Sequence, residues 1–144
     1  MGAGGGGGGT ILGASNPFTG AGAALEYMGR GYWGGWSGIV VATNGADGAL
    51  FSFTSPTQAL DVTMCVTVNK DDISGNQAIG WRLSLDNIEV ARFNTGTIDP
   101  NVVPSLDVDP VYFIIPSRSI VLIEATCTDT DDIGFSGLIR AREI

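Results

Sequence analysis

The stretch Leu60-Asp61-Val62-Thr63-Met64-Cys65-Val66-Thr67-Val68 alternates large apolar side chains with shorter or polar ones. A strict two-residue period of this kind is typical of a β-strand with one face on a core and the other face toward solvent. Similar runs recur along the chain, separated by Gly, Pro, Asn and Asp, and no window combines a helical period with capping residues. The sequence therefore predicts an all-β protein of eight strands, at residues 36–42, 49–54, 60–68, 79–85, 88–93, 111–115, 120–127 and 134–142, with a short edge strand at 24–28.

The turns between these runs indicate how the strands connect. Asp86-Asn87 separates two runs by only two residues and tolerates the positive φ angles of a tight hairpin. Residues 94–109 contain Gly96, Pro100 and Pro104 and are expected to form a long connection that crosses between sheets. Eight antiparallel strands pack naturally as two four-stranded sheets. We therefore expect a jelly-roll β-sandwich, with an immunoglobulin-like sandwich as the alternative.

The two cysteines bear on that alternative. Cys65 shares a strand face with Thr63 and Thr67, whereas Cys127 shares a face with Ile123 and Ala125. Thiols on opposite faces of their strands do not meet, so we expect free thiols. An immunoglobulin-type bridge packed against Trp81 is therefore disfavoured.

Composition excludes many kinds of chemistry. The 144 residues contain no histidine, which removes imidazole-based catalysis and histidine-ligated metal sites. A formal net charge of −8 with a single lysine disfavours nucleic acid and anionic membranes as partners. The sequence has no apolar run long enough for a transmembrane helix and no signal-peptide pattern at residue 1. No cofactor is expected.

The length suits one domain, which we assign to residues 21–144, preceded by a glycine-rich arm at residues 1–20. Polyglycine buries no side chain and loses much conformational entropy when it orders. The arm is therefore expected either to be flexible or to order against a neighbouring subunit. Its apolar residues Ile11, Leu12 and Phe18 are candidate anchors for the second case.

Several stretches resemble the single jelly-roll proteins that occur on virus and bacteriophage capsids as minor, cement or decoration subunits. They are Trp36-Ser37-Gly38, the Leu50–Thr54 strand, the Trp81–Val90 hairpin, the Phe113–Ile120 segment around Pro116, and Gly134-Phe135-Ser136-Gly137. The hairpin turn departs from the family pattern, because Asp86-Asn87 stands where Asn-Gly is usual. The resemblance implies a virion structural role, commonly as a trimer with an N-terminal arm.

The acidic clusters offer the only metal-binding pattern in the chain. Asp129, Asp131 and Asp132 place carboxylates in one turn, and carboxylate oxygens are calcium ligands. The spacing lacks the EF-hand pattern, and acidic turns are usually only solvated. Calcium is therefore a weak hypothesis.

The chain has four glutamates, Glu26, Glu89, Glu124 and Glu143, as candidates for a glycosidase pair. Such a pair requires two close carboxylates, one of them with a raised pKa. Glu124 alternates with apolar positions of its strand and is expected to face solvent or a neighbour. The sequence therefore predicts no enzyme.

Two sets of residues are candidates for subunit contacts. Tyr32, Trp33 and Trp36, with Tyr27, form an aromatic group among glycines that suits a core corner, a subunit interface or sugar stacking. Arg140 and Arg142 share one face of the last strand, where they either meet solvent or pair with carboxylates of a neighbour.

The sequence thus predicts a non-enzymatic subunit that binds other capsid proteins on the virion surface and is assembled in the host cytoplasm. A homo-oligomer, with a trimer favoured, is expected. The alternative is a carbohydrate-binding or host-receptor-recognition head. A signalling-type trimeric jelly roll is a third possibility, disfavoured by the missing secretion signal and the unpaired cysteines.

Overall fold

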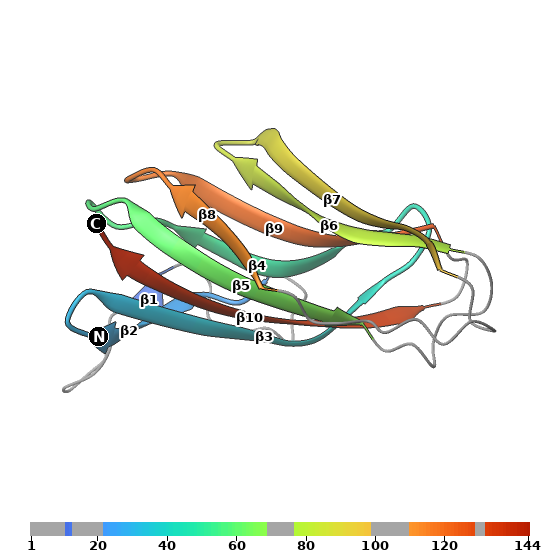
Figure 1. Ribbon diagram of the computed structural model, residues 1–144, viewed down its shortest axis with the longest axis horizontal. Coiled ribbons are helices and arrows are strands. Elements are labelled where there is room, and N and C mark those ends of the chain that lie inside the picture. Colours follow the sequence, from blue (N-terminus) through green and yellow to red (C-terminus); the bar gives the residue numbers. More distant parts are fainter. Residues whose placement is uncertain (1–10, 13–21, 69–76, 99–109, 129–131) are drawn as a thin grey trace.

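The computed structural model describes residues 11–12, 22–68, 77–98, 110–128 and 132–144. Within these ranges the protein is all-β, with two antiparallel sheets packed as a sandwich (Figure 1). The strands are β1 (Ile11–Leu12), β2 (Leu25–Gly29), β3 (Tyr32–Ala42), β4 (Gly48–Thr54), β5 (Leu60–Val68), β6 (Gln77–Leu85), β7 (Ile88–Ile98), β8 (Val111–Ile115), β9 (Ile120–Cys127) and β10 (Ile133–Glu143).

One sheet has six strands in the order β1-β2-β3-β10-β5-β8, and the other has four in the order β4-β9-β6-β7. Strand β10 is central to the larger sheet because it pairs with both β3 and β5 over most of its length. The core lies between the sheets and is made of the inward-facing residues of both. Fully buried members include Phe51, Leu60, Met64, Ile123 and Ile139.

The predicted alternation is confirmed in β5. Leu60, Val62 and Met64 are fully buried, whereas Asp61 is exposed. The hairpin prediction is also confirmed, since Asp86 and Asn87 join β6 to β7 with φ angles of 52° and 68°. Two consecutive residues at positive φ match the right-handed twist of the flanking strands.

The strand count differs from the eight predicted. Among the described residues there are nine strands of five or more residues and the two-residue β1. The short strand expected at residues 24–28 is β2, which is not an edge because β1 pairs with its outer side. Strand β7 continues to Ile98, into the segment that was expected to be a connection.

A glycine bulge sets the pairing of β3 with β10. Ser37 and Gly38 together oppose the position of Gly137, where the register shifts. Gly38 has a φ of 68°, and the Ser37 hydroxyl accepts a 2.7 Å hydrogen bond from the Gly137 amide. The bulge adds one residue to β3 and therefore changes which of its side chains face the core.

Gly137 itself is a point of close approach between the sheets. A Cβ placed there would lie 2.8 Å from Cε2 of Phe51, whose side chain is fully buried. We expect Gly137→Ala to lower the free energy of unfolding by about 1–3 kcal/mol, because a close-packed ring has to move. Chemical denaturation measures this change.

Leu138→Ala is the matched control for that substitution, since the neighbouring side chain faces outward and is 59% exposed. Leu138→Ala should lower the free energy of unfolding by clearly less than Gly137→Ala does. Equal losses at the two positions would contradict the inter-sheet contact as the cause.

Candidate functional site

The bulge places two large apolar residues of β3 on the same outward face. Trp33 and Ser37 face the core before the bulge, and Val40 and Ala42 face the core after it. Trp36 and Ile39 therefore both point to solvent. In an unbroken strand, two residues that are three positions apart would lie on opposite faces. Trp36 is 65% exposed and Ile39 is 82% exposed.

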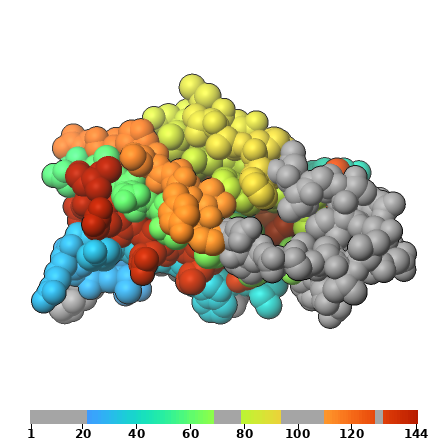
Figure 2. Space-filling model, viewed as in Figure 1, coloured from blue at the N-terminus to red at the C-terminus, as the bar shows by residue number. Residues whose placement is uncertain are grey.

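Neighbouring strands extend this surface across the six-stranded sheet. Leu138 of β10 lies directly beside Trp36 in the ladder, and Cys65 of β5 lies on its other side. The outward positions of β2, β3, β8 and β10 carry exposed large apolar side chains: Met28, Tyr32, Trp36, Ile39, Val41, Tyr112, Ile114 and Leu138. We call this set the outer apolar face. Side chains of β3 (blue to cyan), β8 (orange) and β10 (red) reach the surface in Figure 2.

Trp36 is held against the sheet and does not project freely. Its Nε1–H donates a 3.1 Å hydrogen bond to the Ser136 hydroxyl on β10. Ser136 is the ladder partner of Ile39, so the indole lies toward the Ile39 row. Single exposed apolar side chains are common on soluble domains, whereas several large ones on one sheet face are unusual for an isolated domain.

Charged residues lie within the outer apolar face, in the same ladder rows as Ile114 and Tyr112. Arg142 forms an ion pair with Asp61 across the ladder at 3.7 Å, with both side chains about half exposed. Arg140 lies between Gly34 and Thr63 in the next row and forms no ion pair with a described residue. The sequence prediction that Arg140 and Arg142 share an outward face is confirmed.

The aromatic group expected from the sequence is divided between the two faces. Trp33 is buried, 5% exposed, and packs against Tyr27 with ring centroids 4.9 Å apart. Its indole N–H donates to Glu143 at 3.4 Å. Tyr32 is 41% exposed at the start of β3, and Trp36 faces outward. Trp33 therefore belongs to the core, because its strand position faces the opposite sheet.

The arm candidates have a different placement from the one expected. Ile11 and Leu12 form β1 and pair with Glu26 and Leu25 of the same chain. The sequence offers them as anchors on a neighbouring subunit only for the case in which the arm is not flexible, and the strand that they form here pairs within the chain. Phe18 lies outside the described residues.

The calcium hypothesis gains no support from the geometry. Asp129 and Asp131 lie outside the described residues, and Asp132 is exposed. Within the described part of the chain, no three Cys, Asp or Glu side chains come close enough to hold a metal ion. The two cysteines form no disulfide with each other: Cys127 is buried, and Cys65 is half-buried on the outward side of its strand.

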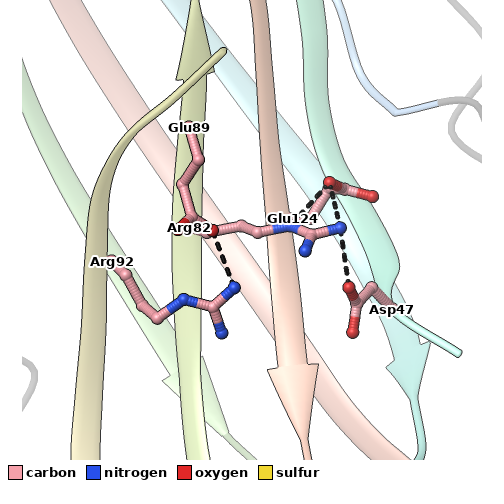
Figure 3. A network of polar contacts seen from close by, with 5 residues as sticks. All are labelled: Asp47, Arg82, Glu89, Arg92 and Glu124. Atoms are coloured by element: carbon pink, nitrogen blue, oxygen red, sulfur yellow. Dashed lines mark hydrogen bonds and ion pairs between the residues drawn. The ribbon is translucent and has the colours of Figure 1, made fainter. Parts of the chain in front are cut away.

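The outer face of the four-stranded sheet carries an ion-pair network instead (Figure 3). Arg82 of β6 contacts Glu124 of β9 at 2.9 Å and Asp47 at 2.8 Å, and its Nε–H also donates to Glu124. The sequence predicts that Glu124 faces either solvent or a neighbour. In the structure, the Glu124 carboxylate pairs with Arg82 of the same chain. The network was missed because the pairing of β6 with β9 is not local in sequence.

Glu89 and Arg92 form a second, more exposed ion pair at 2.7 Å. The hydrogen bond from Arg92 lowers the pKa of the Glu89 carboxyl below its usual range. A glycosidase acid requires the opposite shift, toward a raised pKa.

Comparisons with known proteins add no identification: no family model matches the chain, and neither curated proteins nor solved structures yield a match. Among the residues that the structure describes, no helix is long and apolar enough to cross a membrane.

The sequence singles out Trp36 as a member of an aromatic group and does not point to Ile39, Val41 or Leu138. An unbroken alternation places Ile39 and Val41 on the strand face opposite to Trp36. One local signal points to the bulge, namely Ser37-Gly38 within a strand-like run, since glycine inside a strand often marks a bulge.

The Arg82 network generates a stability prediction. Glu124→Gln keeps the shape of the side chain but removes its charge, and the Glu124 side chain is only 18% exposed. We expect a loss of about 1 kcal/mol in the free energy of unfolding. Urea denaturation at neutral pH measures it.

Glu89→Gln is the control, because its pair with Arg92 is largely solvated, with both side chains 42% exposed. It should leave stability unchanged. If Glu89→Gln and Glu124→Gln lowered the free energy of unfolding equally, the partial burial of Glu124 would not explain the effect of its substitution.

Proposed function

We propose that the sandwich is a jelly roll. The support is the strand order: leaving aside β1 and β2, the sheets read β3-β10-β5-β8 and β4-β9-β6-β7. Successive strands alternate between the sheets, except at the β6–β7 hairpin, which is the path of two interlocked Greek keys. An immunoglobulin-like sandwich distributes its strands differently, with the first two and the fourth and fifth strands in one sheet.

We further propose that the protein is a virion structural subunit that cements or decorates a capsid and acts by protein–protein contact. The observation that carries this proposal is the outer apolar face, which a lone soluble domain has no reason to expose. Its partners are other capsid proteins and further copies of this chain. The place of action is the virion surface, after assembly in the host cytoplasm.

The mechanism of such a subunit is burial of apolar area. Removing apolar surface from water contributes about 25 cal/mol per Å² before the costs of association are subtracted. A sheet presents its side chains on a fixed backbone, so few conformations are lost when the face is covered. The Trp36–Ser136 hydrogen bond contributes to this preorganisation by holding the indole against β10.

Attachment to particles tests this function. Particles isolated from cells that produce the protein should contain it, release it in mild denaturant, and bind the purified chain again until their sites are saturated. Absence of the protein from the particle fraction would overturn the proposal.

Deletion of residues 1–18 refines the test. Among the described residues it removes only β1, so the melting temperature should stay nearly unchanged while attachment to particles weakens. Unaltered attachment would exclude a role for the N-terminal segment, and a collapsed melting transition would show that the segment is part of the folded domain.

A carbohydrate-binding or host-receptor head is the second candidate. Trp36 and Tyr112 are exposed aromatic side chains on the same sheet, 65% and 70% accessible, and aromatic faces stack on sugar rings. A broad glycan array with the pure protein should then show binding that Trp36→Ala abolishes. No binding across the array would remove this candidate.

A further inference from the structure

The connection between β3 and β4 is a tight hairpin whose two tip residues are Asn44 and Gly45. The Thr43 amide donates to the Ala46 carbonyl and the Ala46 amide donates to the Thr43 carbonyl, both at 3.0 Å. Gly45 has a φ of 83°, and Asn44 is not among the described non-glycine residues with a positive φ. These φ signs are those of a type II turn, which prefers glycine at its third residue.

This hairpin contains two dipeptides that share one reaction. Asn44-Gly45 is the single Asn-Gly dipeptide of the chain, and Asp47-Gly48 is its single Asp-Gly dipeptide. In both, the side-chain carbonyl carbon is placed to form a five-membered ring with the next backbone nitrogen. Glycine favours the ring because it has no Cβ to shield its nitrogen. The sequence alone therefore offers two equivalent sites.

The structure leaves the first of these sites accessible. Asn44 and Gly45 are both exposed at the hairpin tip. The two hydrogen bonds that close the tip belong to Thr43 and Ala46, so neither of them uses the Gly45 amide. Rotation of the Asn44–Gly45 peptide into position for ring closure therefore requires a local opening of the tip, and the sheets stay paired.

The structure protects the second site. Gly48 is buried at the start of β4, where it pairs with Ala125 of β9. A Cβ placed on Gly48 would lie 2.5 Å from the carbonyl oxygen of Val41, so the backbone is closely packed there. The Asp47 carboxylate is held by Arg82 at 2.8 Å (Figure 3). Ring closure at Asp47 therefore requires β4 to leave its place in the sheet.

From this contrast we propose that Asn44 is a site of spontaneous deamidation in the folded protein, with Gly45 supplying the attacking nitrogen. That nitrogen bonds to the side-chain carbonyl carbon of Asn44 and loses its proton. The bond from this carbon to the side-chain nitrogen breaks, and ammonia leaves. The product is a five-membered succinimide, and no oxidant or reductant is involved.

Water then opens the succinimide at one of its two carbonyl carbons. Opening at the side-chain carbon gives aspartate at residue 44, whereas opening at the backbone carbon gives isoaspartate, in which the chain runs through the side chain. One water is consumed and one ammonia is released overall. Either product adds one negative charge to the formal net charge of −8, and isoaspartate also lengthens the two-residue tip by one backbone atom.

The rate of ring closure follows the fraction of time that each peptide is free to rotate. Two hydrogen bonds of ordinary net strength slow the reaction at Asn44 by roughly ten- to a hundredfold relative to the unfolded chain. At Asp47 the sheet itself has to open, which slows ring closure by at least about a thousandfold. The folded protein therefore selects Asn44.

Peptide mapping by mass spectrometry tests the proposal on the pure full-length protein. One sample is kept for several weeks in mildly alkaline buffer, and a second sample is kept in the same buffer with concentrated urea. In buffer we expect aspartate and isoaspartate at residue 44, recognised by the mass gain and the separate elution of the isoaspartyl peptide, with Asp47 unchanged. In urea, conversion at Asn44 should be roughly ten- to a hundredfold faster, and isoaspartate should also form at Asp47.

Asn87 is the matched control within the same chain. It is exposed at the tip of the β6–β7 hairpin, but the next residue is Ile88, whose branched Cβ shields the backbone nitrogen. Asn87 should therefore stay intact in both samples. Asn44→Gln is the control for the assignment, because its longer side chain forms a less favourable six-membered ring. This variant should gain no carboxylate at residue 44.

Three results would overturn the inference. They are an Asn44 that stays intact in the folded protein, conversion at Asn87 as fast as at Asn44, and conversion at Asp47 as fast as at Asn44 in the folded protein. None of these measurements involves particles. The proposed capsid role is therefore tested independently of this modification.

Discussion

The hydrogen-bonded register of β10 with its two neighbours is the constraint on which the rest of this protein depends. Strand β10 lies between β3 and β5, so any slip in its pairing would turn a whole strand over and expose the core. The register with β3 changes at one place, the Ser37–Gly38 bulge, which the Gly137 amide and the Ser37 hydroxyl hold in position. The absence of a side chain at Gly137 also lets Phe51 of the opposite sheet approach closely.

The same bulge connects the core to the surface. Before it, Trp33 packs inside with Tyr27, and after it Val40 and Ala42 fill the sandwich. The extra residue is accommodated by Gly38 at positive φ, a conformation that costs a non-glycine residue about 1–2 kcal/mol. As a result Trp36 and Ile39 share the outward face. One local irregularity therefore both keeps Val40 and Ala42 in the core and places Ile39 and Val41 in the outer apolar face.

The two outer faces of the sandwich differ in chemistry. The four-stranded sheet presents the Arg82, Glu124 and Asp47 network, in which the charges are satisfied within the chain. The six-stranded sheet presents apolar side chains and Arg140, which has no ion pair with a described residue. The charges of the four-stranded sheet are thus paired within the chain, whereas the six-stranded sheet exposes apolar side chains around Arg140. The proposed assembly role rests on this asymmetry.

Much of the strand pattern followed from the sequence alone. The alternation in β5, the tight turn at Asp86-Asn87, the opposite faces of the two cysteines and the outward Arg140 and Arg142 depend only on the two-residue period and on local turn preferences. The sheet order, the Arg82–Glu124 pair and the outward position of Ile39 depended on contacts between distant segments. The two-residue period of a strand predicts which residues share a face. Where that period is interrupted in β3 depends on the pairing of β3 with β10, which is a contact between distant segments.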